Sequence, residues 1–127
     1  MNTQKKYRIL IADDNHINIK VSEYILKPIA EVLDFAMNGV DVLEKFKNNT
    51  YDIILMDVKM PVMDGYEATK RIRKIEAANK VENPIIIIAT TANNQPEEVE
   101  ICKNVGMNDL IAKPFNMNDL MSIIIHT

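Results

Sequence analysis

Short apolar runs alternate with segments of helical periodicity along the chain. The runs are rich in β-branched residues and end at polar side chains, which is typical of strands. They predict five strands, at 8–12, 32–37, 51–56, 85–91 and 109–112. The other segments place apolar residues three or four positions apart, as in helices that pack one face against a core. They predict five helices, at 15–27, 40–48, 66–78, from Pro96 to a cap at Gly106, and from about Asn116 to Ile125.

The order of these elements predicts a single α/β domain. Strands that alternate with helices form a parallel sheet with helices on both faces, and right-handed crossovers make that sheet doubly wound. The run from Ile85 to Thr91 is the most apolar, as expected of a strand that is covered on both faces. The chain shows no repeat, linker or low-complexity segment, and its 127 residues suit one domain. We therefore expect residues 1–127 to form one domain.

The periodicity also predicts which helix faces are apolar. The first helix carries one such face and is expected to close or bend at Pro28. The expected apolar positions of the first three helices are Ile17, Val21, Tyr24 and Ile25; then Val40, Leu43 and Phe46; then Ala68, Ile72 and Ile75.

Composition excludes several classes of function. Apolar residues make up 47% and charged residues 26%, an ordinary balance for a folded domain, and the net charge is −3. Without a Lys/Arg run, direct nucleic-acid binding and attachment to anionic membranes are disfavoured. The single cysteine, Cys102, excludes an intrachain disulfide and a cysteine-based metal site, and it favours a reducing compartment.

Motif-based sites of other kinds are also absent. Three scattered glycines cannot form a phosphate-binding glycine-rich loop, and His16 and His126 are too far apart for a two-histidine metal motif. The longest apolar stretch falls far short of the about 18 residues of a transmembrane helix, so no membrane insertion is expected. The N-terminus lacks the pattern of a signal peptide.

Polar side chains lie at the carboxyl ends of four predicted strands: Asp13 and Asp14, Asp57, Thr90 and Thr91, and Lys113. In a doubly wound sheet, ligands bind at these carboxyl ends. If the first and third strands are neighbours, three carboxylates converge, and a cation must relieve their repulsion. Oxygen ligands without histidine or cysteine favour Mg²⁺. With a hydroxyl and an ammonium nearby, the set suits a phosphoryl group.

Each residue also has an ordinary interpretation. Asp13, Asp14 or Asn15 could cap the first helix, and Asp57 could be a solvated strand end. Thr91 could belong to a turn and Lys113 to the solvated surface, while Asp64 before a glycine suits a turn better than a ligand. The coincidence of four strand ends in order favours a shared site.

The residues resemble a known family at this point. The motifs are ILIADDN (9–15), ILMDVKMPVMDGYEATKRIR (54–73), IATTAN (88–93) and GMNDLIAKPF (106–115). Together they resemble the receiver domain of two-component response regulators, and most of all receivers of hybrid sensor histidine kinases. The resemblance runs from about Tyr7 to Ile125. It implies a flavodoxin-like, doubly wound sheet of five parallel strands in the order 2-1-3-4-5, with five helices.

The resemblance also implies a role for each site residue. Asp57 matches the aspartate that accepts the phosphoryl group. Asp14 matches a direct Mg²⁺ ligand, Asp13 a ligand that acts mainly through water, and Lys59 a ligand through its backbone carbonyl. Lys113 matches the lysine that pairs with the phosphoryl group and precedes a proline in a peptide bond that is usually cis.

The family also has a threonine or serine whose hydroxyl donates to the phosphoryl group, and Thr91 rather than Thr90 matches it. Family members carry Thr or Ser before a small residue, some 22 positions ahead of the lysine, and Thr91 precedes Ala92 at that distance from Lys113. The chain departs from the family at Leu110, where an aromatic residue or histidine is usual, and at Lys59, where uncharged or other polar residues are common. The last helix is also short.

The resemblance implies a domain that takes a phosphoryl group from a phosphohistidine onto Asp57 with Mg²⁺, then hydrolyses it slowly. It acts as a timed switch rather than a turnover enzyme. The implied partners are a histidine kinase or a histidine phosphotransfer protein, in the cytoplasm, alone or within a membrane-tethered hybrid kinase. The oligomeric state stays open, with a phosphorylation-dependent dimer as one alternative.

Three other functions are alternatives for a sequence of this kind. A phosphatase with an aspartyl-phosphate intermediate usually has a DxD motif after its first strand, whereas Asp13 and Asp14 are adjacent. A flavin module would need a Ser/Thr/Gly-rich first loop, which this chain lacks, and the chain has no tryptophan to stack on the ring. A degenerate receiver that serves only as a scaffold would be expected to lack part of the pocket.

Overall fold

The computed structural model describes residues 5–92 and 95–126 and shows a parallel sheet between two layers of helices. The strands are β1 (Tyr7–Ala12), β2 (Ala30–Ala36), β3 (Ile53–Asp57), β4 (Ile86–Thr91) and β5 (Asp109–Ala112). They pair in the order β2-β1-β3-β4-β5, every pair parallel, which confirms the predicted fold. The last residue of the IATTAN motif, Asn93, lies outside the described residues.

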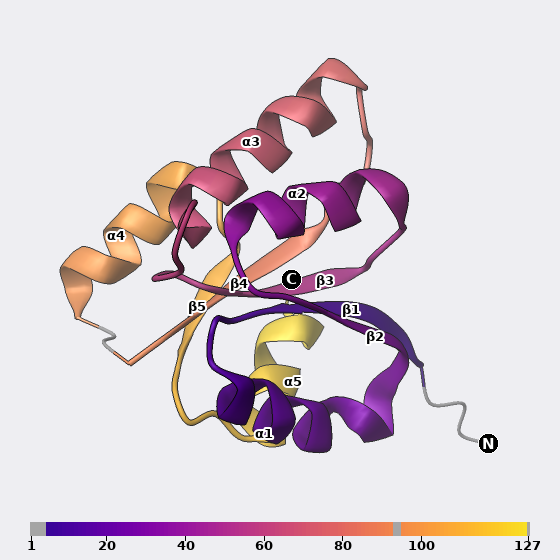
Figure 1. Cartoon of the computed structure of the whole chain (residues 1–127), viewed down its shortest axis with the longest axis vertical. Coiled ribbons are helices and arrows are strands. Elements are labelled where there is room, and N and C mark those ends of the chain that lie inside the picture. The colour runs from indigo at the N-terminus through magenta and orange to yellow at the C-terminus, as the bar shows by residue number, and fades with distance from the viewer. Residues whose placement is uncertain (1–4, 93–94, 127) are drawn as a thin grey trace.

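The helices divide between the two faces of the sheet. They are α1 (His16–Leu26), α2 (Gly39–Asn48), α3 (Gly65–Ala78), α4 (Pro96–Val105) and α5 (Met117–Ile125). In Figure 1, α2, α3 and α4 lie on one side of the sheet and α1 and α5 on the other. Two separate apolar clusters fill these layers, because alternate residues of a strand point to opposite faces. Among the described residues, no helix is both long enough and apolar enough to span a membrane.

Strand and helix boundaries follow the sequence to within about two residues. Pro28 acts as expected: α1 ends at Leu26, and a short 3₁₀ turn, η1 (Lys27–Ile29), leads directly into β2. Gly106 caps α4 with φ of 108°, the left-handed conformation that glycine adopts without a steric cost. The helix ends predicted at Pro28 and Gly106 are therefore both confirmed.

The apolar face predicted for α1 is wrong at Ile17, Val21 and Tyr24, and of the predicted residues only Ile25 packs against the core. Its buried residues are Ile19, Ser22 and Leu26, whereas Ile17 is 73% exposed and Tyr24 83% exposed. The helix carries two apolar rows, and the sheet covers only one of them. Periodicity shows that a row exists but not which row faces the core, so Ile17, Val21 and Tyr24 form an exposed stripe on α1.

The apolar faces predicted for α2 and α3 agree with the structure at all but one position. On α2, Leu43 is buried and Phe46 packs against the core as expected, but Val40 is 48% exposed and Val42 takes its place inside. The reason is the close approach of the helix start to the loop after β3, where the Gly39 N–H donates to the Met63 carbonyl. On α3 the expected inward residues Ala68 and Ile72 are fully buried, and Ile75 packs beside them.

Candidate functional site

Three carboxylates meet at the carboxyl ends of two neighbouring strands. Asp13 and Asp14 follow β1, and Asp57 ends β3, which pairs with β1 up to Ala12 opposite Met56. Oxygen atoms of the three carboxylates all lie within 4.8 Å of one another. The expected convergence is therefore confirmed, and it follows from the crossover that brings β3 beside β1.

Neither Asp13 nor Asp14 is the N-cap of α1. Asn15 is the N-cap of α1, because its side-chain oxygen accepts a hydrogen bond from the Asn18 N–H at 3.0 Å. Asp13 instead accepts from the Asn15 N–H at 2.9 Å through Oδ1, which orients its carboxylate. Asp14 is exposed, whereas Asp13 is buried. The cap therefore leaves Asp14 and one oxygen of Asp13 for other partners.

Lys113 brings a cation to this cluster from the loop after β5. Its Nζ lies 3.2 Å from Oδ2 of Asp57 and 3.6 Å from Oδ2 of Asp13. The backbone N–H of Lys113 donates to the Thr91 carbonyl at 2.8 Å, which ties the loop to the end of β4. The Lys113–Pro114 peptide bond is cis, as the resemblance implied.

Opposing effects act on the Asp57 carboxyl. Burial is the largest and raises its pKa above the ordinary value. The Lys113 ammonium lowers the pKa, the Asp13 charge raises it, and a hydrogen bond from the Lys59 backbone lowers it, with a raised pKa as the net result. The ionised site is therefore electrostatically costly, and a bound cation would relieve that cost.

The loop between β3 and α3 packs tightly against the site. The Gly65 N–H donates to the Val58 carbonyl at 2.9 Å, and a Cβ at Gly65 would overlap the carbonyl oxygen of Asp57. Only glycine fits this close approach. Asp64 caps α3 by accepting from the Glu67 N–H at 2.9 Å, which fits its interpretation as a turn residue.

Thr91, Lys59 and Leu110 lie where the sequence places them. Thr91 is buried at the end of β4, in register with Ala112 of β5. Lys59 is exposed and follows the site, and Leu110 packs at the edge of the core shared by α2, α3 and α4. The Thr91 hydroxyl and the Lys59 carbonyl keep their roles as predictions.

The donor set fits a hard divalent cation. All three converging side chains are carboxylates, and neither His16 nor His126 belongs to the cluster. Oxygen-only sets of this kind hold Mg²⁺ or Ca²⁺ rather than zinc or copper. The described residues therefore include an acidic cluster that could bind a metal.

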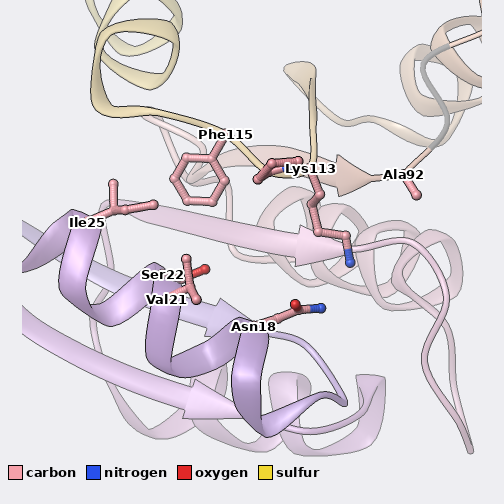
Figure 2. Close-up of a pocket in the computed structure, with 8 residues that line it drawn as sticks. Asn18, Val21, Ser22, Ile25, Ala92, Lys113 and Phe115 are labelled. Carbon is pink, nitrogen blue, oxygen red and sulfur yellow. The ribbon is translucent and has the colours of Figure 1, made fainter.

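A groove of about 370 Å³ opens beside Lys113. Asn18, Val21, Ser22 and Ile25 of α1 line one side, and Ala92, Lys113, Pro114 and Phe115 line the other. Figure 2 shows the labelled α1 side chains on one side of this space and Phe115 and Lys113 on the other. The sequence prediction missed the groove, although the second apolar row of α1 was a visible signal of it.

Comparison with known proteins gives consistent relatives. A sequence model of the response regulator receiver domain matches residues 9–125. The chain is 40% identical over 126 residues to hybrid signal transduction histidine kinase B of Dictyostelium discoideum, covering 94% of this chain and 6% of that protein. It is also 40% identical over 121 residues to the peroxide stress-activated histidine kinase mak1 of Schizosaccharomyces pombe, covering 93% and 7%. The chain thus spans a small fraction of these relatives.

Solved structures agree with the fold. One neighbour is the receiver domain of Ssk1 in a co-crystal with the histidine phosphotransfer protein Ypd1 of Saccharomyces cerevisiae, with 31% identity, 94% and 87% coverage of the two chains and a TM-score of 0.87. Another is the receiver domain of the sensor histidine kinase PA1611 of Pseudomonas aeruginosa, solved with a magnesium ion in its active-site cleft, with 36% identity, 95% and 96% coverage and a TM-score of 0.79. The chain therefore belongs to the response regulator receiver domain family.

Proposed function

We propose that this receiver domain accepts a phosphoryl group on Asp57 from a phosphohistidine, with Mg²⁺ in the acidic cluster, and later hydrolyses it. The observation that carries the proposal is the convergence of Asp13, Asp14 and Asp57 with Lys113 at 3.2 Å from the proposed acceptor. We further propose that residues 1–127 form one receiver domain. It would work in the cytoplasm, alone or as part of a hybrid kinase.

The residues supply complementary parts of the transfer. An Asp57 carboxylate oxygen forms the bond to phosphorus, the bond from phosphorus to the imidazole nitrogen breaks, and its electron pair stays on that nitrogen. Lys113 can turn from Asp57 to the incoming phosphoryl oxygens, and the Thr91 hydroxyl would donate to one of them. Asp13, Asp14 and the Lys59 carbonyl would hold Mg²⁺, which neutralises charge on the transferring oxygens.

Intact mass spectrometry after incubation with acetyl phosphate tests this proposal. With Mg²⁺ we expect the mass of one phosphoryl group to appear, then decay once acetyl phosphate is removed. Asp57→Asn and a sample with a chelator should show no gain, whereas Asp52→Asn, an exposed aspartate away from the cluster, should be labelled normally. A wild-type protein that stays unlabelled for hours would overturn the proposal and favour a scaffold role.

We also propose that the phosphodonor docks on the exposed stripe of α1. Ile17, Val21 and Tyr24 form an apolar row beside the groove that leads to Lys113, and apolar patches next to a reactive site mark interaction surfaces. Lys113 lines this groove and contacts Asp57, so a partner seated on α1 would bring its histidine close to the proposed acceptor. The similarity to a receiver solved with a phosphotransfer protein supports this class of partner.

The docking surface can be tested separately from the chemistry. Phosphorylated Ypd1 serves as donor, and acetyl phosphate serves as a donor that needs no surface. Ile17→Ser with Tyr24→Ser should slow transfer from Ypd1 at least tenfold and leave acetyl phosphate labelling unchanged. Ile125→Ser, which alters an equally exposed apolar residue on α5, is the matched control. Equal transfer rates in all three proteins would contradict the assignment of α1.

A further inference from the structure

A second groove lies between α2 and α3, on the face of the sheet opposite α1. Figure 1 shows these two helices side by side above the strands. The groove has a volume of about 440 Å³, and its floor is formed by Leu43 and Ile75. Because α1 and α5 cover the other face, an occupant of this groove would leave the phosphodonor groove open.

The rim of the groove is strongly basic. Four cations line it: Lys47 from α2, and Lys70, Arg71 and Lys74 from α3. Glu67 is the one carboxylate among the described lining residues, and it pairs with Arg71 at 2.9 Å. Within the described part of the chain, Lys47, Lys70 and Lys74 make no ion pair. The rim of the groove therefore carries more positive than negative charge, in a protein whose net charge is −3.

This arrangement works against the stability of the isolated domain. Lys70 and Lys74 are four positions apart on α3, so their like charges lie on the same helix face. The hydrogen bond from Arg71 lowers the pKa of the Glu67 carboxyl below its ordinary value, and the charges of Arg71, Lys70 and Lys74 lower it further. The groove is thus a region of positive potential above an apolar floor.

We propose that this groove binds an acidic amphipathic helix of a partner protein. Apolar residues in one row of that helix would cover Leu43 and Ile75, and Asp or Glu residues on its flanks would pair with the three lysines. A helix laid between two others is a standard packing and recognition mode. Leu43 is already packed in the core, but Ile75 is only partly buried, so such a helix gains an apolar contact there that a polyphosphate or nucleic acid would not use.

The proposal is tested with a synthetic helical peptide that carries leucines three and four positions apart and glutamates on both flanks. Fluorescence anisotropy of the labelled peptide should show saturable binding that weakens as salt is added. Heteronuclear NMR should place the largest shifts at Leu43, Lys70 and Ile75. A peptide with serine in place of every leucine should bind at least tenfold more weakly.

Charge reversal provides the matched variants. Lys70→Glu with Lys74→Glu should weaken peptide binding at least tenfold. Lys20→Glu with Lys103→Glu, which makes the same change in net charge on α1 and α4, should bind like the wild type. Circular dichroism and labelling by acetyl phosphate should be normal in both, which separates a failure here from a failure of the phosphorylation proposal.

Several outcomes would overturn the proposal. The proposal fails if the wild type shows no saturable peptide binding. It also fails if the two charge-reversed proteins lose the same amount of peptide affinity. Equal affinity for the serine peptide would reduce the groove to a nonspecific polyanion surface. Binding to phosphatidylserine vesicles without binding to the peptide would assign the patch to a membrane instead.

Discussion

Lys113 reaches past the intervening strand β4 to place its ammonium 3.2 Å from Oδ2 of Asp57 at the end of β3. The same ammonium lies 3.6 Å from Asp13, so it partly neutralises two members of the acidic cluster. A metal ion held by the acidic cluster would therefore share these carboxylates with the lysine. Because both are positively charged, each should weaken the other's binding, which makes their interplay measurable.

Loss of Lys113 should increase the stabilisation that Mg²⁺ provides. In Lys113→Ala the carboxylates lose their only described ammonium partner, so the metal-free protein should melt at a lower temperature. Added Mg²⁺ should then restore most of the loss, because no lysine competes for the carboxylate charge. Melting curves over a Mg²⁺ titration measure this, with Lys103→Ala as control. An unfolded mutant that Mg²⁺ does not rescue would assign Lys113 a structural role.

Loss of Asp14 should have the opposite effect on the Mg²⁺ response. Asp14→Asn removes the proposed direct ligand and one of three repelling charges, so the metal-free protein should be more stable than the wild type. The rise in melting temperature caused by Mg²⁺ should largely disappear. Glu100→Gln makes the same charge change on the exposed surface of α4 and should leave that rise intact. An undiminished Mg²⁺ effect in Asp14→Asn would refute its role as ligand.

Relief of strain at Val62 should stabilise the domain. Val62 has φ of 70° and is 82% exposed, and a β-branched residue is disfavoured in this left-handed conformation. Asparagine tolerates it, so Val62→Asn should raise the free energy of unfolding by about 1 kcal/mol. Urea denaturation measures the change. Val81→Asn replaces another exposed valine, one without positive φ, and should give no gain; equal effects would argue against strain.

Alkaline pH should weaken the fold through Cys102. Burial, with a smaller effect of the Glu98 charge, raises the pKa of this thiol from 9.0 to about 11. The folded state therefore disfavours the thiolate. The contribution of the neutral Cys102 thiol to the free energy of unfolding is complete below about pH 9 and is lost as the pH rises towards 11. Iodoacetamide should label Cys102 slowly at pH 8 in the folded protein and rapidly in urea. Rapid labelling without urea would contradict this prediction.

The element order and the candidate site residues could be predicted from the sequence. Alternation of β-branched runs and helical periods is a local property, so the five strands were recognisable without a structure. Polar residues that follow those runs were equally visible, because a strand end is marked by its own neighbours. Asp57 and Lys113 could therefore be assigned to one edge of the sheet.

Tertiary structure alone decided how these parts face one another. Asn15, rather than either aspartate, takes the helix cap, because the turn after β1 directs its side chain to the Asn18 N–H. Ile17 and Tyr24 stay exposed because the sheet covers only one of two apolar rows on α1. The basic groove exists because crossovers lay α2 beside α3. The cap depends on the local geometry of one turn, whereas the exposed stripe and the basic groove depend on contacts between segments distant in sequence, which periodicity does not encode.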